Sequence, residues 1–248
     1  MSLLEGFLLV GAGVFAGFAN TVAGGGSLLT LPLLIFMGLP SAEANASNRV
    51  AIFLQNIFSV AGFKSKGVSV FPFAIWLAIS ASAGAFLGSR IAVDIQDQVF
   101  NRILAVVMLV VIGLMVFKPK AKQRVEEMIS QPNTWLSVFI FFFIGIYGGF
   151  IQAGVGFLII ATLTGVHGFN MAKTNSIKVF IVLCYTVIAL AIFWMEGKIK
   201  WEYGLVLAIG NSAGGWIGSR WSVGQSDKLI KKILVVMVLG LSIKLWFF

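Results

Sequence analysis

The sequence predicts an all-α polytopic membrane protein with two homologous halves of four transmembrane helices each, about eight helices in all. Each half also carries one short apolar segment that we expect to be a broken or re-entrant helix. The class follows from composition, because 59% of the residues are hydrophobic and only 11% are charged, whereas about a quarter of a soluble domain is charged. Long apolar runs recur along the chain, and sequence blocks of the first half return in the second.

The first apolar run, residues 3–23, predicts a transmembrane helix. Glu5 lies at its start and no basic residue precedes it, so the run lacks the positive n-region of a cleaved signal peptide. The further apolar segments are, in order, 28–38, 46–63, 70–91, 100–117, 135–153, 157–167, 176–195, 203–221 and 230–248. Segments 28–38 and 157–167 are too short to cross a bilayer, because a spanning helix needs about 20 residues.

Glycines interrupt the chain at the start of each short segment. Gly24, Gly25 and Gly26 precede the first one, and Gly154 and Gly156 lie at the start of the second. A glycine in a helix costs about 1 kcal/mol relative to alanine, and backbone groups freed in hydrocarbon have no water to bond. We therefore expect each break to lie beside protein or a water-filled cavity, where the N-terminus of the short helix would attract an anion.

A polar stretch, KPKAKQRVEEMISQPN at 118–133, separates the two sets of apolar segments. We expect it to be a cytoplasmic linker between a first transmembrane repeat, residues 1–117, and a second, residues 134–248. The matching blocks are SAGAFLGSR and SAGGWIGSR (82–90 and 212–220), RILAVVMLV and KILVVMVLG (102–110 and 232–240), and SNRVAIF and TNSIKVF (47–53 and 174–180). These matches indicate an internal duplication.

The number of spans per half decides the symmetry of the repeats. Four full-length spans, an even number, predict parallel repeats related by an axis along the membrane normal. If the short segments instead cross fully, each half has five spans and the repeats are inverted. Both arrangements remain open from the sequence, and we favour the four-span arrangement.

The net charge of +9 would suggest a nucleic-acid partner in a soluble protein. Here the basic residues lie mostly in short loops between apolar runs, so we interpret them as a topology signal and expect no nucleic-acid partner. Placing the N-terminus and the linker in the cytoplasm gives a modest excess of basic loops on that side, as the positive-inside rule requires.

Polar side chains gather around both glycine breaks and form a hypothetical anion site. The candidates are Asn20, Thr21, Gly24, Gly25, Gly26, Ser47, Asn48 and Arg49 in the first half, and Gln152, Gly154, Gly156, Thr174, Asn175 and Lys178 in the second. Backbone N–H groups, amides and hydroxyls would donate to the oxygens of the anion, and a nearby cation would offset its desolvation. Arg49 and Lys178 could supply that charge, or could instead extend to the membrane interface.

Two further features have simpler interpretations. Glu43 could carry a proton if transport is proton-coupled, although a carboxylate in the first turn of a helix is also favourable by itself. The G-x-x-x-G pairs, Gly84 with Gly88 and Gly214 with Gly218, predict close packing between helices.

The glycine break followed by LLTLPLLIFMGLPSAEANASN, its counterpart GVGFLIIATLTGVHGFNMAKTN and the two G-x-x-x-G blocks resemble the sulfite exporter TauE/SafE family of bacterial membrane permeases. The resemblance covers essentially the whole chain. It implies a multi-pass protein of the bacterial inner membrane that carries sulfite, sulfonates or other sulfur-containing anions.

We therefore expect a secondary transporter, in the exporting direction, that works by alternating access around a midplane site between the repeats. Its partners would be a small anionic substrate, the lipid bilayer and a possible coupling ion, either proton or sodium, while the oligomeric state stays open. No P-loop, G-x-S-x-G or H-E-x-x-H motif occurs, so we expect no enzyme activity, cofactor or metal. The alternatives are an anion channel and a non-transporting membrane scaffold or assembly protein, although a scaffold needs no backbone break at membrane depth.

Overall fold

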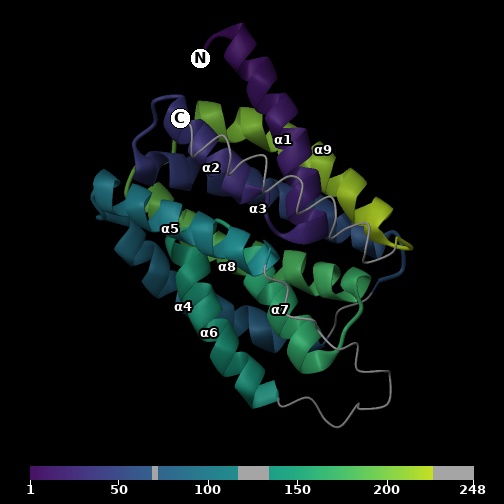
Figure 1. Cartoon of the computed structure of the whole chain (residues 1–248). Coiled ribbons are helices and arrows are strands. Elements are labelled where there is room, and N and C mark those ends of the chain that lie inside the picture. Colours follow the sequence, from purple (N-terminus) through teal and green to yellow (C-terminus); the bar gives the residue numbers. More distant parts are fainter. Residues whose placement is uncertain (69–71, 117–133, 226–248) are drawn as a thin grey trace.

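The computed structural model describes residues 1–68, 72–116 and 134–225, and every regular element in these ranges is a helix. The helices are α1 (Leu3–Ala23), α2 (Ser27–Phe36), α3 (Ser41–Lys64), α4 (Phe73–Val93), α5 (Asp97–Val116), α6 (Thr134–Phe150), α7 (Val155–His167), α8 (Met171–Met195) and α9 (Trp201–Ser222) (Figure 1). The all-α prediction is confirmed, and the two segments predicted to be short form α2 and α7. The predicted linker at 118–133 and the predicted segment at 230–248 lie outside the described residues.

Local sequence signals set both ends of α1 and the start of α8. Ser2 and Glu5 form a capping box at the start of α1, in which the Ser2 hydroxyl accepts from Glu5 N at 3.2 Å and the Glu5 carboxylate accepts from Ser2 N at 2.7 Å. Gly24 ends α1 with φ of +87°, a conformation that glycine adopts without strain. Asn170 starts α8, and its side chain accepts from Lys173 N at 2.9 Å.

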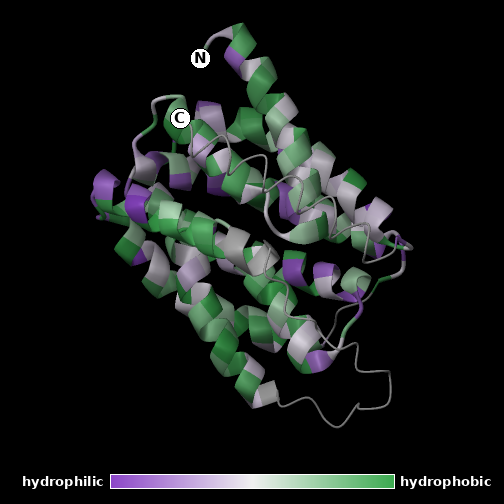
Figure 2. Ribbon diagram, in the orientation of Figure 1, coloured by the Kyte–Doolittle hydropathy of each residue, from purple (hydrophilic) through white to green (hydrophobic). Residues whose placement is uncertain are grey.

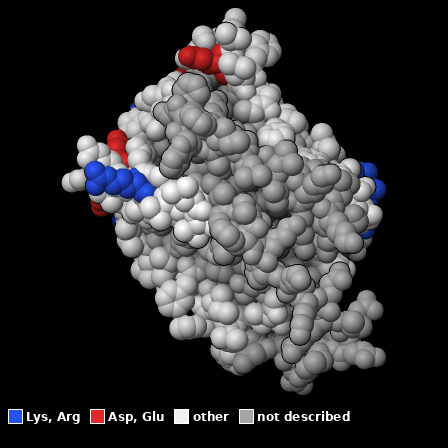
Figure 3. Space-filling view, viewed as in Figure 1, with Lys and Arg blue, Asp and Glu red and all other residues white. Residues whose placement is uncertain are grey.

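Apolar side chains cover the outside of the helices. Leu3, Phe7 and Trp135 are 86%, 77% and 84% exposed, and Figure 2 shows hydrophobic ribbon along the outer helices. On the face drawn in Figure 3, the charged side chains in view lie at the margins. Within the described residues α1, α4 and α8 are long and apolar enough to cross a membrane. These features agree with the predicted polytopic membrane protein.

Six long helices pack in the order α1, α9, α3, α8, α4, α6, so that each helix contacts the next. In Figure 1, α1 and α9 lie side by side on one side of the molecule and α4 and α6 on the opposite side, with α3 and α8 between them. The shorter α2 packs against α3 and α1. Its Leu31 and Leu34 belong to the same buried cluster as Phe100 and Leu104 of α5. Helices of residues 1–117 and of residues 134–248 therefore interlock.

The helix contacts also give the direction of each helix. A Cβ placed on Gly210 of α9 would meet the Val10 carbonyl of α1 at 2.1 Å, and one on Gly214 would meet the Val14 carbonyl at 2.0 Å, so α1 and α9 run in the same direction. In the same way, a Cβ on Gly204 of α9 would meet Val50 of α3, and one on Gly215 would meet Ser59. For α4 and α6, a Cβ on Gly84 would meet Phe142, and one on Gly88 would meet Ile146. Hence α3 also runs with α9, and α6 runs with α4.

The central helices α3 and α8 run in opposite directions. Arg49, early in α3, lies over the Phe193 ring late in α8, with its Cζ 5.0 Å from the ring centroid. Lys178, early in α8, donates to the Thr21 carbonyl of α1, and the Thr21 hydroxyl bonds to Ser59 late in α3. The early part of each central helix therefore lies beside the late part of the other.

Helices α4 and α8 are also in contact. Arg90 near the end of α4 pairs with Glu196 at the end of α8 at 3.4 Å, so these two helices run together. In the described part of the chain, α1, α3 and α9 therefore run one way and α4, α6 and α8 the other.

These directions correct the expected symmetry. The first helix of one half, α1, runs opposite to the first helix of the other half, α6, so the parallel arrangement that the even span count favoured is wrong. Because α1 and α3 run together, the chain between residues 24 and 40 returns towards the end at which α1 began. The inverted arrangement, which the sequence left open, agrees with these directions, while the duplication itself stays a prediction.

The G-x-x-x-G pairs lie where helices meet, as predicted. A Cβ on Gly84 or Gly88 would lie 2.0 or 1.9 Å from a carbonyl oxygen of α6, and one on Gly214 would lie 2.0 Å from a carbonyl oxygen of α1. A real Cβ never approaches a backbone oxygen that closely, so these positions serve close packing of helix backbones.

Candidate functional site

The two glycine breaks meet each other inside the molecule. A Cβ on Gly24 would lie 2.6 Å from the Gly156 Cα, and a Cβ on Gly156 would lie 2.3 Å from the Gly24 Cα. Both residues are buried. The break after α1 and the start of α7 therefore touch backbone to backbone, as the hypothesis of one shared site requires.

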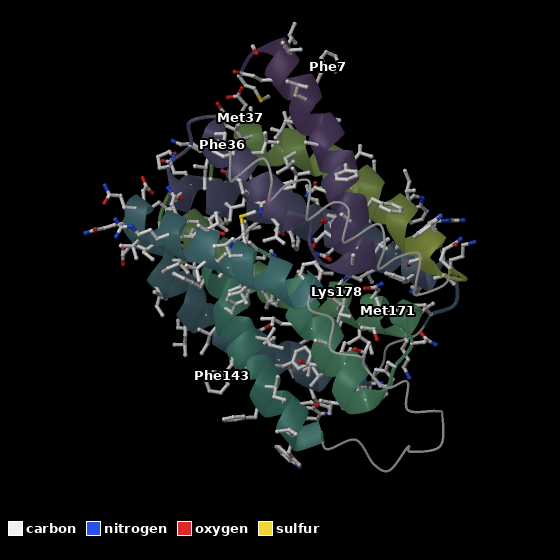
Figure 4. The ribbon with its side chains drawn as sticks, viewed as in Figure 1. Phe7, Phe36, Met37, Phe143, Met171 and Lys178 are labelled. Carbon is white, nitrogen blue, oxygen red and sulfur yellow. The ribbon has the colours of Figure 1, made fainter. Side chains whose placement is uncertain are left out.

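Lys178 lies in the middle of the molecule (Figure 4) and is 2% exposed. Its Nζ donates to the carbonyl oxygens of Asn20 at 2.9 Å and Thr21 at 2.8 Å, and to the Asn175 Oδ1 at 2.8 Å. The Asn175 Nδ2 donates to the Val22 carbonyl at 2.7 Å. Two side chains of α8 thus bond to the last carbonyls of α1, where a helix runs out of intrahelical donors. The Asn20 carbonyl also accepts from Gly24 N at 2.9 Å.

Arg49 makes the corresponding contacts at the end of α6. Its Nη1 donates to the Gly148 carbonyl at 3.0 Å, and its Nη2 donates to the carbonyls of Gly149 at 2.6 Å and Phe150 at 3.3 Å. The Asn45 Nδ2 donates to the Phe150 carbonyl at 2.8 Å. Each central helix therefore uses an amide and a cation to hold the C-terminus of the first helix of the other half, which is the negative end of its dipole.

Neither cation extends to the membrane interface, since Arg49 and Lys178 are 0% and 2% exposed. The ion pairs among the described residues join the N-terminus to Glu202, Arg90 to Glu196 and Lys200 to Glu43. No aspartate or glutamate in the described ranges is buried. The two buried positive charges therefore face carbonyl dipoles and have no carboxylate partner.

The two cations differ in the donors that they have left. An ammonium group has three N–H donors, and all three of Lys178 are used; a guanidinium has five. The Arg49 Nε and the neighbouring Asn48 Nδ2 are buried donors with no hydrogen-bond partner among the described residues. An unpaired buried donor is costly. This part of the site is therefore suited to bind a ligand whose oxygen atoms accept hydrogen bonds.

A polar network joins α1 to α3 beside Lys178. Asn20 Nδ2 donates to Gln55 Oε1 at 3.0 Å, Gln55 Nε2 donates to Thr21 Oγ1 at 3.1 Å, and Thr21 Oγ1 lies 2.8 Å from Ser59 Oγ. Gln55 and Ser59 were not among the predicted site residues. Their spacing of four places them on one face of α3, a signal that the sequence does contain.

The second break has its own polar residues. Gln152 has φ of +66°, in the left-handed region that few non-glycine residues adopt. Its Nε2 lies 3.4 Å from the Thr186 hydroxyl, and its Oε1 has no partner among the described residues. The Tyr185 hydroxyl is also buried and unpartnered there. Sequence reasoning missed Tyr185, although it lies two helical turns beyond Lys178.

The short helices begin without a side-chain cap. Gly26 precedes α2 and Gly154, with φ of +73°, precedes α7, and neither N-terminus receives a side-chain hydrogen bond. A Cβ on Gly26 would lie 2.1 Å from the Ala16 carbonyl, which explains the glycine there. Gly25, the residue before Gly26, is also buried. Both N-termini therefore keep the character of an anion-attracting helix end.

Not every predicted residue faces the junction of the breaks. The Ser47 hydroxyl accepts from Lys200 N at 2.9 Å, just before α9, and the Thr174 hydroxyl donates to the Phe169 carbonyl at 3.3 Å. Asn48 does take part, because its Oδ1 accepts from Thr30 of α2 at 2.7 Å. Glu43 pairs with Lys200 at 3.3 Å rather than with either buried cation.

A cavity of about 700 Å³ opens between α3 and α9, away from both cations. Its lining is almost entirely apolar and includes Leu54, Phe58, Ile209 and Trp216. Such a lining cannot compensate the desolvation of a small anion. In the described ranges, no three His, Cys, Asp or Glu side chains gather in a way that could hold a metal ion.

A known protein family matches this chain over nearly its whole length. The family model for the sulfite exporter TauE/SafE matches residues 9–245. No solved structure matches the chain.

Relatives are similar over nearly their whole length. The chain is 28% identical over 246 residues to the probable membrane transporter protein YfcA of Escherichia coli, covering 98% of this chain and 90% of that protein. It is 25% identical to the probable membrane transporter protein ORF9 of Sinorhizobium sp, covering 98% and 92%, and 25% identical to a probable membrane transporter protein of Haemophilus influenzae, covering 96% and 93%. Together with the apolar helices, these matches indicate a multi-pass membrane transporter, and the chain belongs to the sulfite exporter TauE/SafE family.

Proposed function

We propose that this protein is a secondary transporter that exports a small sulfur-containing anion, such as sulfite or an organosulfonate, across the bacterial inner membrane. The observation that carries the proposal is the pair of buried cations, Arg49 and Lys178, at the junction of two helix breaks without a buried carboxylate in the described residues. An intramembrane charge of this kind marks a substrate pathway. Resemblance to the family supports the substrate class.

The anion would bind on the Arg49 side of the junction. A sulfite or sulfonate group presents three oxygens, which need donors from several directions. The Arg49 Nε and the Asn48 Nδ2 are buried and have no partner in the described part of the chain, and the uncapped starts of α2 and α7 add helix-dipole potential. Hydrogen bonds from a charged donor are worth about 1.5–3 kcal/mol each, so this donor set can offset the desolvation of the anion.

A carrier mechanism is favoured over a channel. The backbones of Gly24 and Gly156 are in direct contact, which closes the junction in this conformation. The opposite directions of α1 and α6 resemble the inverted repeats of transporters in which one bundle rocks against the other. Alternating access would then separate the two breaks on one side at a time.

The test is anion exchange in proteoliposomes. Vesicles loaded with unlabelled sulfite, taurine or sulfoacetate should take up the same labelled anion saturably, while vesicles loaded with chloride or sulfate should not. Arg49→Lys keeps the charge but removes the Nε donor, so we expect at least a tenfold loss of apparent affinity, which corresponds to about 1.4 kcal/mol. Arg90→Lys is the matched control, because Arg90 is an exposed residue paired with Glu196, and it should exchange as the native protein does.

If Arg49→Lys has the same melting temperature as the native protein and exchanges the anion with the same affinity, Arg49 is not part of the binding site. Flux that does not saturate and shows no exchange would favour the channel. No flux of any sulfur-containing anion would contradict the substrate class.

A further inference from the structure

The end of α1 is a cation site that is filled by a side chain of the protein. Carbonyl groups at the C-terminus of a broken helix are where many transporters hold a coupling sodium ion. Here the Lys178 ammonium lies among two such carbonyl oxygens, those of Asn20 and Thr21, and the side-chain oxygen Oδ1 of Asn175, at 2.8–2.9 Å. A sodium ion cannot share this position with the ammonium group.

Arg49 and Lys178 hold corresponding helix ends but have different chemistry. A guanidinium stays protonated in proteins, whereas a lysine ammonium can release its proton when its surroundings change. All three donors of Lys178 are used by the protein, while the Arg49 Nε is unpartnered in the described residues. Arg49 thus has a donor left for an anion. The contacts of Lys178, in contrast, depend on whether its amine is protonated.

No other titratable group bonds to the ammonium. Several other titratable residues on α8 or on the described helices packed against it are buried or half-buried. They are Glu43 and Arg49 of α3, Tyr147 of α6, His167 of α7, Cys184 and Tyr185 of α8, and Tyr203 of α9. Glu5 of α1 and Arg90 of α4 are exposed. Among these, none has a hydrogen bond or an ion pair to the Lys178 Nζ. A proton taken up or released here is therefore held by Lys178 itself.

We propose that Lys178 is the proton-binding residue that couples transport to the proton gradient, an inference that rests on the proposed function. The ammonium gives one proton to water on the side to which the site is open and keeps the electron pair as a neutral amine. Its contacts with the Asn20 and Thr21 carbonyls then lose their charge-assisted character, which weakens the hold of α8 on the end of α1. Taking a proton from water on the other side restores the hold, so one proton crosses per cycle.

The same contacts explain how the proton would act on the rest of the site. Asn20 and Thr21 also bond through their side chains to Gln55, and Thr21 bonds to Ser59. Release of the end of α1 therefore changes the packing of α1 against α3. Gly24, three residues beyond Thr21, forms the contact with Gly156, so the proton site is continuous with the closed junction.

The test uses Lys178→Arg, which keeps the charge but cannot release the proton. The variant should fold, because Arg49 shows that a guanidinium can hold a helix end of this kind. The control is Lys173→Arg, at an exposed position in the first turns of the same helix. The probe is methanesulfonate, whose charge does not change with pH, so that any pH effect belongs to the protein.

Two measurements in sodium-free proteoliposomes separate the proposals. Exchange of methanesulfonate at equal pH reports the proposed function, and accumulation under a gradient of one pH unit reports coupling. With one proton per anion the gradient changes the accumulation up to tenfold in the native protein and in Lys173→Arg. Lys178→Arg should not accumulate the anion under the same gradient, whatever rate of exchange it retains. Accumulation by Lys178→Arg equal to that of the native protein, or accumulation that needs sodium, would overturn the inference.

A measurement without substrate covers the case in which methanesulfonate is not exchanged by the native protein or by Lys178→Arg. Hydrogen exchange of residues 20–27 should rise between pH 6 and pH 9 beyond the chemical rate in the native protein, and should follow the chemical rate in Lys178→Arg. The same pH dependence in both proteins would overturn the role of Lys178. A difference between them, with no exchange by the native protein, would mean that the substrate class is wrong while the proton site stands.

Discussion

Gly24 and Gly156 occupy the point at which the two halves of the site touch, and they do so for different reasons. Gly24 has a left-handed φ of +87° and also lies against the opposing backbone, whereas Gly156 belongs to α7 and has only the close approach. The effect of steric contact can therefore be separated from the effect of backbone strain at Gly156.

We expect Gly156→Ala to lower the free energy of unfolding by about 1–3 kcal/mol, because its Cβ would lie 2.3 Å from the Gly24 Cα and overpacking costs that much. Gly165→Ala in the same helix has no heavy atom within 4 Å of its Cβ, so it should be neutral or stabilising by up to about 1 kcal/mol. Thermal unfolding of both variants in one detergent makes the comparison. Equal melting temperatures would show that the two breaks do not touch.

At the scale of the helices, small residues decide which helices meet. Lipid tails are as apolar as leucine, so helix association in a membrane depends on close backbone approach and van der Waals contact. Gly84, Gly88, Gly145 and Gly149 provide this between α4 and α6, where each added Cβ would lie 1.9–2.3 Å from a carbonyl oxygen. The pairing of α4 with α6 thus depends on these four glycines.

Gly88→Leu should therefore separate α4 from α6 and lower the free energy of unfolding by about 3 kcal/mol or more, the upper end of the usual cost of overpacking. Gly11→Leu is the matched control, since Gly11 is exposed on α1 and no heavy atom lies within 4 Å of its Cβ. Size-exclusion chromatography and thermal unfolding of the purified variants distinguish them. A Gly88→Leu protein as monodisperse and stable as Gly11→Leu would contradict the close α4 and α6 contact.

At the scale of the whole molecule, the two halves complete each other. The packing order α1, α9, α3, α8, α4, α6 alternates elements of residues 1–117 and of residues 134–248. Lys178 holds the end of α1, and Arg49 holds the end of α6. Each half by itself would expose buried cations and unbonded helix ends to lipid, which is costly.

Expressed separately, residues 1–117 and residues 134–248 should aggregate or be degraded, whereas expressed together they should copurify as one complex. Affinity purification through a tag on one half, followed by detection of the other, measures this. Gly88→Leu in the first half should reduce the recovery of the second, because it removes the α4 and α6 contact. Two halves that are each stable and monodisperse would show that they are independent units.

The sequence by itself determined the membrane class, the all-α fold, the two short helices and the packing role of the G-x-x-x-G pairs. These properties depend on composition and on neighbours within a few turns, so local patterns contain them. It also identified Arg49 and Lys178, because a charge within an apolar run is conspicuous.

Only the tertiary structure decided the direction of the halves and the partners of the two cations. Span counting favoured parallel halves because the sequence does not say where the chain goes between residues 24 and 40, whereas contacts between α1, α3 and α9 fix their common direction. Lys178 bonds to carbonyls 157 and 158 residues away, and Arg49 to carbonyls 99–101 residues away. Backbone carbonyls are the same at every residue, so a side chain that binds them leaves no mark in the sequence of its partner.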